Sequence, residues 1–216
     1  MPDVTAGTPE DLVAAARAFG VHDGRVLEAI RETPREGFVP AAVADRAYED
    51  RPLPIPHEQV TTQPSLVAAM VEALGLTGGE AVLEIGTGLG WQTALLARLA
   101  GTVWSVERFA DLAAEARANL ARHGVVNVTV VVGDGSRGLP EAAPFDAILV
   151  AAAYPSVPAP LAGQLADGCR LVQPLGPGGD EDVVLFGRVG AELVRLRTVT
   201  GAHFVRLVGA HGFAER

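Results

Sequence analysis

Three glycines at alternating positions follow an apolar run in the middle of the chain. The segment reads Gly86-Thr87-Gly88-Leu89-Gly90 and comes directly after Ala81-Val82-Leu83-Glu84-Ile85. Glycine lets the backbone turn tightly and lets a ligand approach it closely, because there is no Cβ in the way. The helix that we expect to begin near Trp91 leaves its first amides open, and open amides bind polar groups of ligands. The pattern predicts a ligand site at a strand-to-helix turn.

A carboxylate stands at the end of the next apolar run. Glu107 follows Val103-Trp104-Ser105-Val106. Its distance in sequence from Gly86 is that of the ribose-binding acid in nucleotide-binding α/β folds, where one carboxylate accepts hydrogen bonds from both ribose hydroxyls. The ligand is therefore predicted to be a nucleoside.

The glycine spacing selects among the nucleoside cofactors. A dinucleotide fingerprint requires its third glycine at position 91, and this chain has Trp91 there. Three glycines in the order G-x-G-x-G, preceded by the acidic Glu84, suit a ligand that has no phosphate and has a cationic amino-acid end. S-adenosylmethionine has both properties, and S-adenosylhomocysteine would be the product. The alternatives are a tight turn in another α/β protein and, disfavoured by Trp91, a nicotinamide site.

Gly133-Asp134-Gly135 closes a third apolar run, Val128–Val132. Asp134 could accept the adenine amino group, although Asp-Gly is also an ordinary turn sequence. Asp146 is expected to begin a strand rather than to touch a ligand. The residues predicted to bind the cofactor are Glu84, Gly86, Thr87, Gly88, Gly90, Gln92, Glu107, Asp134 and Gly135.

Size and composition restrict the class of protein. The 216 residues, of which 49% are hydrophobic and 20% charged, are enough for one well-filled α/β domain. A net charge of −9 argues against a nucleic-acid partner. The single Cys169 and five histidines without ligand spacing predict neither a disulfide nor a metal site. No apolar stretch has the length of a membrane span and no leader is visible, so we expect a soluble, cytoplasmic protein without membrane contacts. We also expect it to be a monomer.

The N-terminal part reads as two helices and a long loop. Thr8-Pro9-Glu10-Asp11 has the residues of a helix start, and Asp23 is suited to cap a second helix that must stop before Pro34. Residues 37–63 are rich in proline, which argues against regular structure there. We predict an ordered loop.

Strands and helices then alternate. Pro64 is suited to start a helix that ends at Leu74, and the apolar runs 81–85, 103–107, 128–132, 145–150 and 170–174 read as strands with helices between them. This order predicts an α/β fold with a doubly wound, mostly parallel sheet and right-handed crossovers. Three further runs, 183–189, 192–199 and 204–208, predict an antiparallel edge. We expect one domain over 1–216, divided into N-terminal helices and loop (1–63), cofactor core (64–176) and antiparallel strands (177–216).

With these motifs in place, the chain resembles the protein-L-isoaspartate O-methyltransferase family over nearly its whole length. The glycine hinge is common to many methyltransferases, whereas Pro34-Arg35-Glu36-Gly37-Phe38-Val39-Pro40 and the loop that begins at Ala47 are far more specific. The remaining motifs are Gly133-Asp134-Gly135, Pro144–Ile148, Gly168–Gly176 and Phe204–Gly209. The resemblance implies a Rossmann-like methyltransferase fold.

The resemblance to this family also implies the reaction. S-adenosylmethionine would methylate the free carboxylate of L-isoaspartyl or D-aspartyl residues in damaged proteins, and the ester would then cyclise without the enzyme to a succinimide that hydrolyses partly to aspartate. A carboxylate with a pKa near ~4 is ionised at neutral pH and needs no general base. The enzyme must then position the reactants and exclude water, and positioning lowers the activation free energy by roughly 7 kcal/mol or more.

The resemblance places the substrate site in Val60-Thr61-Thr62-Gln63, which we call the substrate loop. Thr62 falls on the catalytic serine of the family and keeps a hydroxyl, although its extra methyl restricts χ1. Val60 lacks the family's hydroxyl, and Pro56 replaces the usual glycine. Another interpretation is that Thr62 or Gln63 only caps the helix that begins at Pro64.

These differences keep two other functions open. One is O-methylation of a carboxylate in a biosynthetic peptide or small molecule. The other, of a different class, is a non-catalytic protein that binds S-adenosylmethionine and recognises aspartyl damage. The unaltered glycine hinge and the two acids Glu84 and Glu107 favour an enzyme.

Overall fold

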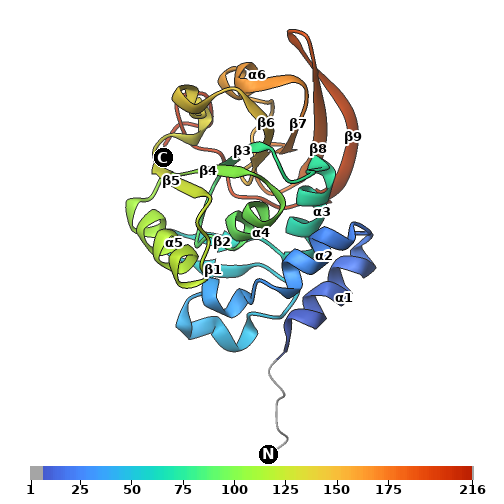
Figure 1. The fold of residues 1–216 in the computed structure, drawn as a ribbon. Coiled ribbons are helices and arrows are strands. Elements are labelled where there is room, and N and C mark those ends of the chain that lie inside the picture. Colours follow the sequence, from blue (N-terminus) through green and yellow to red (C-terminus); the bar gives the residue numbers. More distant parts are fainter. Residues whose placement is uncertain (1–6, 216) are drawn as a thin grey trace, which may run out of the picture.

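A seven-stranded sheet forms the centre of the protein in a computed structural model that describes residues 7–215. The strand order is β5-β4-β3-β6-β7-β8-β9 (Figure 1). Their bounds are β3 Ala81–Ile85, β4 Thr102–Glu107, β5 Val128–Val132, β6 Phe145–Val150, β7 Leu165–Leu175, β8 Glu181–Val189 and β9 Glu192–Ala202. The pairs from β5 to β7 are parallel, and the pairs β7–β8 and β8–β9 are antiparallel. The predicted fold class, a mostly parallel sheet with an antiparallel edge, is confirmed.

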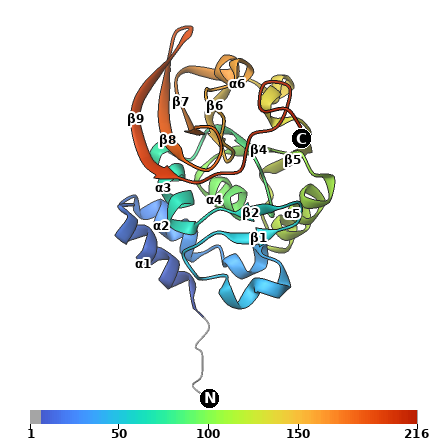
Figure 2. The same ribbon diagram turned by 180° about the vertical axis from the view of Figure 1, so that it is seen from behind.

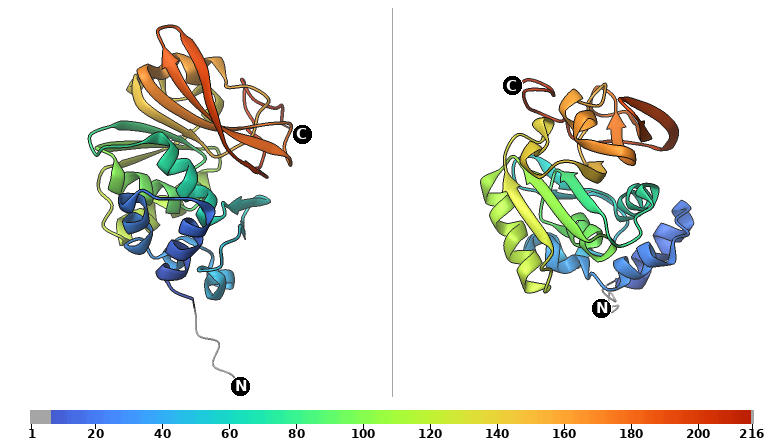
Figure 3. Two further views of the ribbon diagram at one scale, coloured as in Figure 1. Left: turned by 90° about the vertical axis from the view of Figure 1, so that its right-hand side faces the viewer. Right: turned by 45° about the horizontal axis from the view of Figure 1, so that its top comes forward.

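Helices cover both faces of the sheet (Figures 1 and 2). Their bounds are α1 Pro9–Phe19, α2 Gly24–Arg31, α3 Pro64–Leu74, α4 Trp91–Leu99, α5 Ala110–Arg122 and α6 Ala159–Gln164. Helix α1 packs on α2 and α3. The turn between β8 and β9 projects away from the body of the molecule (Figure 3). None of the helices within 7–215 is both long enough and apolar enough to cross a bilayer.

Side chains alternate between two cores along each central strand, as the period of two requires. Val82 and Leu149 enter the core formed with α1 to α5, whereas Leu83 and Ile148 enter the core on the other face, which includes Leu161 of α6. Strand β3 lies between β4 and β6, so the chain leaves β3 in one direction and returns on its other side. This reversal makes a crevice at the carboxyl end of β3, where α/β folds bind ligands.

The predicted N-terminal helices are confirmed. Thr8 precedes α1, and its amide donates to the carboxylate of Asp11 at 2.7 Å. Asp23 caps α2 by accepting from the amide of Arg25 at 2.8 Å. Asp146 lies in β6, where its carboxylate accepts from the amide of Ala81 at 2.8 Å, and thus aligns the start of β3.

The prediction that residues 37–63 lack regular structure is wrong. The segment contains the 3₁₀ helix η2 Ala41–Arg46 and an antiparallel hairpin, β1 Leu53–Ile55 and β2 Gln59–Thr61; the preceding 3₁₀ helix, η1 Arg35–Phe38, overlaps its start. Proline is compatible with a two-stranded hairpin because an edge strand does not need every amide. In β1 the flanking leucine and isoleucine are buried while the proline between them is exposed.

The prediction of a strand over 204–208 is also wrong. After β9 the chain turns back across the carboxyl edge of the sheet, and residue Arg206 forms only an isolated parallel bridge with Ala153. We call residues 204–213 the C-terminal segment. Two shorter 3₁₀ helices, η3 Gly135–Arg137 and η4 Pro140–Ala142, precede β6. Helix α6 lies between the predicted strands 145–150 and 170–174, where the alternation predicts a helix without giving its bounds. The first part of β7 lies outside the predicted strand, because the run before residue 170 alternates too weakly.

Candidate active site

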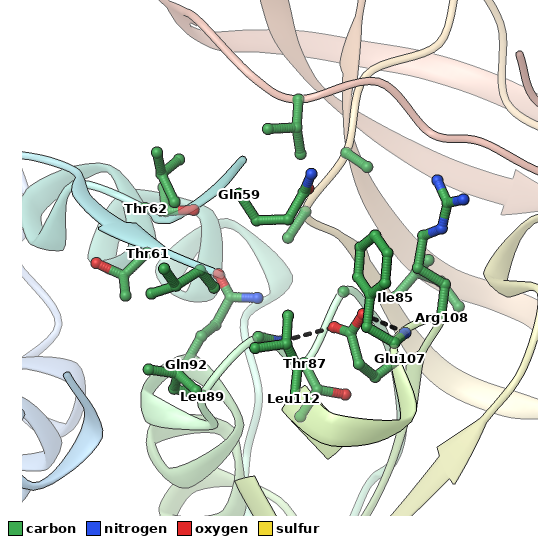
Figure 4. Close-up of a pocket in the computed structure, with 18 of the residues that line it drawn as sticks. Gln59, Thr61, Thr62, Ile85, Thr87, Leu89, Gln92, Glu107, Arg108 and Leu112 are labelled. Atoms are coloured by element: carbon green, nitrogen blue, oxygen red, sulfur yellow. Dashed lines mark hydrogen bonds between the residues drawn. The ribbon is translucent and has the colours of Figure 1, made fainter. Parts of the chain in front are cut away.

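A cleft opens at the carboxyl ends of β3 and β4 (Figure 4). Including its open mouth it measures about 920 Å³, within the usual range of small-molecule sites. Its walls include the glycine hinge, the β1–β2 hairpin with the substrate loop, the start of α5, and the C-terminal segment. Residues far apart in sequence therefore share one cavity.

The hinge has the backbone conformation that the sequence predicts. Gly86, Gly88 and Gly90 have φ values of 96°, 56° and 95°, a left-handed region that favours glycine. The amide of Gly86 donates to the carbonyl of Val106 at 2.9 Å, which ties the hinge to β4. A Cβ on Gly90 would lie 3.4 Å from Cγ of Leu120 in α5, so this glycine also permits close packing.

Glu107 is held at the cleft wall by two backbone amides. Its Oε2 accepts from the amide of Gly88 at 2.9 Å, and its Oε1 accepts from the amide of Phe109 at 3.1 Å. Figure 4 shows both bonds. Only 5% of the residue is exposed. Each oxygen has further lone pairs, so the fixed carboxylate can accept two hydroxyl groups of a ligand.

Glu84 lies behind the hinge and does not line the cleft. Its carboxylate is fully buried and accepts from the side-chain Nε2 of Gln92 at 2.8 Å and from the hydroxyls of Thr93 and Ser105, each at 2.5 Å. Burial raises the pKa of Glu84 to about 7, although these three hydrogen bonds act to lower it and the charge of Glu107 raises it further. Glu84 thus joins β3, β4 and the first turn of α4.

Gln92 and Thr87 connect this buried network to the cleft, which both residues line. The Nε2 of Gln92 is bound to Glu84, whereas its Oε1 is buried without a hydrogen-bond partner in the part of the chain that the structure describes. A buried amide oxygen without a partner is costly, and a donor on a bound ligand would satisfy it. The hydroxyl of Thr87 is bound to Ser105 at 2.5 Å.

Asp134 is turned away from the cleft. Its Oδ1 accepts from the amide and hydroxyl of Ser136, and its Oδ2 accepts from the amide of Ala210 at 2.8 Å. Burial would raise the pKa of Asp134, but these hydrogen bonds and that from Arg137 lower it overall. Gly135 does line the cleft, and a Cβ there would clash with Ile85. Asp134 therefore anchors the C-terminal segment beside the site.

The substrate loop forms the opposite wall, across the cavity from Glu107 (Figure 4). Val60, Thr61 and Thr62 line the cleft, whereas Gln63 does not. Val60 is 42% exposed at the mouth. Thr61 accepts a hydrogen bond from Arg35 at 2.6 Å. No atom of residues 7–215 forms a hydrogen bond with the hydroxyl of Thr62, which is therefore available to a ligand.

The interpretation of Thr62 or Gln63 as a simple helix cap is wrong. Gln63 occupies the N-cap position of α3 but makes no side-chain bond to the helix amides. Asp50 does this instead: its Oδ1 accepts from the amide of Ser65 and its Oδ2 from the hydroxyl, both at 2.8 Å. The side-chain Nε2 of Gln63 donates to the same carboxylate at 3.0 Å.

The β1–β2 hairpin reaches across to α5 through His57, a residue that sequence reasoning missed. The ring of His57 stacks on Phe109 with centroids 4.1 Å apart, and its Nε2 lies 2.8 Å from the carboxylate of Asp111. The hydrogen bond from His57 is the main reason that the pKa of Asp111 is lowered. His57 and Glu58 have left-handed φ values of 62° and 56°, as a tight hairpin turn requires.

Sequence reasoning also missed Arg35 and assigned no role to Val205–Val208, although both belong to motifs that it singled out. Val205–Val208 line the cleft, and Arg35 lies behind the substrate loop. No group of three or more His, Cys, Asp or Glu residues within 7–215 is arranged to hold a metal ion.

Known proteins resemble the chain in sequence and in structure. A family model described as protein-L-isoaspartate(D-aspartate) O-methyltransferase matches residues 8–212. The protein-L-isoaspartate O-methyltransferase of Methanoculleus marisnigri is 52% identical over 200 residues, which cover 91% of this chain and 89% of that protein. The one of Anaeromyxobacter dehalogenans is 58% identical over 167 residues, which cover 77% and 80%.

A solved structure of a protein-L-isoaspartate O-methyltransferase superposes with a TM-score of 0.83 at 32% identity, covering 95% of this chain and 67% of that one. A structure from Plasmodium falciparum, titled as a protein of this kind in complex with S-adenosyl-L-homocysteine, has a TM-score of 0.80 and covers 94% of this chain and 99% of that one. At 19% identity, the second similarity supports the fold alone.

Proposed function

This chain belongs to the protein-L-isoaspartate(D-aspartate) O-methyltransferase family, and we propose that its cleft transfers a methyl group from S-adenosylmethionine to the free carboxylate of L-isoaspartyl or D-aspartyl residues in damaged proteins. The observation that supports this most directly is that one cavity joins the glycine hinge and Glu107 to the available hydroxyl of Thr62. The methyl ester then forms a succinimide without the enzyme, and hydrolysis returns part of it to aspartate.

The residues of the cleft fit the cofactor. Glu107 would accept both ribose hydroxyls, since its carboxylate is fixed by two amides and still has free lone pairs. The unpartnered Oε1 of Gln92 would accept from the α-ammonium group. Glycines 86, 88 and 90 would let the ligand approach the backbone closely. When bound, S-adenosylmethionine supplies an electrophilic methyl group on a sulfonium.

Glu84 and Asp134 have indirect parts in this proposal. Glu84 holds the side chain of Gln92 from behind, and Asp134 holds the C-terminal segment and the turn at Gly135. Neither carboxylate lines the cleft, so we propose no direct contact of either with the cofactor.

The cleft suits an acceptor that is already ionised. Among the described residues that line it there is no His, Lys, Cys or Tyr, and Glu107 is the one carboxylate. Glu107 lies on the cofactor side, bound to backbone amides, and is poorly placed to take a proton from an acceptor. A carboxylate acceptor loses no proton in the reaction, so it needs no base. Alcohol or amine acceptors would need one.

Thr62 is the proposed catalytic residue. Its hydroxyl would donate to one carboxylate oxygen of the acceptor and so orient the other toward the methyl group. Val60 and Thr61 would contact the peptide around it. The β1–β2 hairpin, held to α5 through His57, would exclude water, which strengthens the attraction between an anionic acceptor and a cationic cofactor.

A paired-peptide assay tests the function. The protein is incubated with methyl-labelled S-adenosylmethionine and with either an isoaspartyl peptide or its aspartyl twin. We expect base-labile label in the isoaspartyl peptide alone. Equal labelling of both would reject the specificity, labelling of other carboxylates alone would indicate a biosynthetic acceptor, and cofactor binding by calorimetry without turnover on any acceptor would indicate a recognition protein.

The proposal also includes a cytoplasmic monomer that acts on polypeptides rather than on nucleic acid or membranes. The net charge of −9 supports the exclusion of nucleic acid, because phosphate binding requires a basic surface. Light scattering of the purified protein, with and without cofactor, tests the monomeric state.

A further inference from the structure

Arg35 is a charged residue with no exposed surface, and it lies behind the substrate loop. Its guanidinium is 5.5 Å from the centre of the Trp91 ring. Burial lowers the pKa of Arg35 to about 10, although the nearby Asp50 raises it, so the group stays charged at neutral pH. A buried charge without an internal anion in direct contact is costly unless many hydrogen bonds compensate it.

Those hydrogen bonds reach two parts of the N-terminal region. Nη1 donates to the carbonyls of Ala47 and Glu49 at 3.1 and 3.2 Å. Nη2 donates to the carbonyl of Arg51 at 3.2 Å, to the hydroxyl of Thr61 at 2.6 Å and to the carbonyl of Thr62 at 3.2 Å. One side chain thus joins the segment before the hairpin to the substrate loop.

The other end of the loop is also held. Asp50, between two of the residues whose carbonyls Arg35 binds, accepts from Gln63 and from the amide and hydroxyl of Ser65. The loop is therefore fixed through Thr61 and the carbonyl of Thr62 on one side and through Gln63 on the other. Thr62 lines the cleft, and its hydroxyl forms no hydrogen bond with any described residue.

We infer that Arg35 is a positioning residue for methyl transfer, which acts by fixing Thr62. This rests on the proposed function, in which Thr62 orients the acceptor carboxylate. A displacement of about 1 Å in such a group costs on the order of 100-fold in rate. If Arg35 contributed only to stability, its substitution would affect turnover and cofactor binding alike. If Arg35 positions Thr62, its substitution should lower turnover alone, and only while Thr62 is present.

Lysine at position 35 would test this with little change in charge. Its ammonium is a single point with three donors and does not reproduce the planar fork of a guanidinium, so it cannot bind both Thr61 and the carbonyls of the preceding segment. The matched control is Arg98→Lys. Arg98 also binds the N-terminal region, through Thr33 and Glu32, but touches neither the substrate loop nor the cleft.

The measurement is a double-mutant cycle with isoaspartyl peptide, in which Arg35→Lys is made in the unmodified protein and together with Thr62→Ala. We expect Arg35→Lys to lower kcat by about 10-fold to about 100-fold in the unmodified protein and by less than about 3-fold in the presence of Thr62→Ala. Affinity for S-adenosylhomocysteine, measured by calorimetry, is expected to stay unchanged in each variant, and Arg98→Lys to retain the kcat of the unmodified protein.

Each result that departs from these expectations has a separate interpretation. An equal loss of kcat from Arg35→Lys with and without Thr62→Ala would overturn the positioning role and leave the function of Thr62 intact. A normal kcat for Thr62→Ala would overturn the role of Thr62 and that of Arg35 with it. If Arg35→Lys does not fold, Thr61→Val is used, because it removes a bond to Arg35 and keeps the guanidinium. We expect it to lower kcat with unchanged cofactor affinity, and a normal kcat would overturn the inference.

Discussion

Replacing Glu84 by Gln should change how the stability of the protein depends on pH. Glu84 is fully buried, and burial raises its pKa from the ordinary 4.5 to about 7. An acid with a higher pKa in the folded chain binds its proton more tightly there than in the unfolded chain. The free energy of unfolding therefore declines as the pH rises from 4.5 through about 7, and it stays at the lowered value above that range.

The size of this decline follows from the shift. A change from 4.5 to about 7 corresponds to about 3 kcal/mol. Glutamine has nearly the same shape and no charge at any pH. Its carbonyl would still accept from Thr93 and Ser105, and its amide would donate to the unpartnered Oε1 of Gln92 once that amide rotates. The substitution therefore removes the charge and keeps the number of unpaired buried groups at Gln92 the same, with its Nε2 in place of its Oε1.

Urea unfolding of both proteins between about pH 5 and about pH 8 measures the effect. The stability of Glu84→Gln minus that of the unmodified protein should increase with pH and level off above about pH 7. A difference that stays constant or decreases would refute the reasoning. Glu80→Gln is the control, because hydrogen bonds from Thr77 and Gly78 lower the pKa of Glu80 to about 2 despite partial burial. Glu80→Gln should lower the free energy of unfolding by an amount that does not change with pH across this range.

Three further predictions concern the cleft. Thr62→Ser should preserve or raise turnover, since it keeps the hydroxyl and removes the methyl. Thr62→Ala should lower kcat by about 10-fold or more while cofactor affinity stays constant. A large loss of cofactor binding in either variant would contradict the proposed role of Thr62 in orienting the acceptor. Glu107→Gln should weaken S-adenosylhomocysteine binding in calorimetry by about 10-fold to about 150-fold. The reason is that a neutral amide cannot form the charge-assisted hydrogen bond to the ribose, which contributes about 1.5 to 3 kcal/mol. An unchanged Kd would exclude Glu107 from the site. His57→Ala should speed proteolysis of the β1–β2 hairpin and raise the peptide KM, since it removes the contacts with Phe109 and Asp111; unchanged values would show that these contacts do not hold the hairpin.

The backbone of the proposed cofactor side of the cleft could be predicted because its signals are local. The glycine hinge encodes its own left-handed backbone, and Glu107 ends a strand whose position follows from the alternation of elements. Asp134 shows where this reasoning stops. An acid at a strand end could face either side of the turn, and its partner, the amide of Ala210, follows the run 204–208, which the sequence wrongly predicts to be a strand.

The conformation of residues 37–63, on the proposed acceptor side, could not be predicted because it depends on groups outside the segment. Proline removes amide donors, so a proline-rich segment has more carbonyls than its own backbone can bind. Arg35 supplies the missing donors: it collects the carbonyls of residues 47, 49, 51 and 62 in one buried group. Such a segment looks irregular by propensity, yet one cation binds four of its carbonyls and joins its parts. In the proposed mechanism these bonds serve the reaction, because an acceptor that needs no base depends on placement, and placement requires a loop that is held in position.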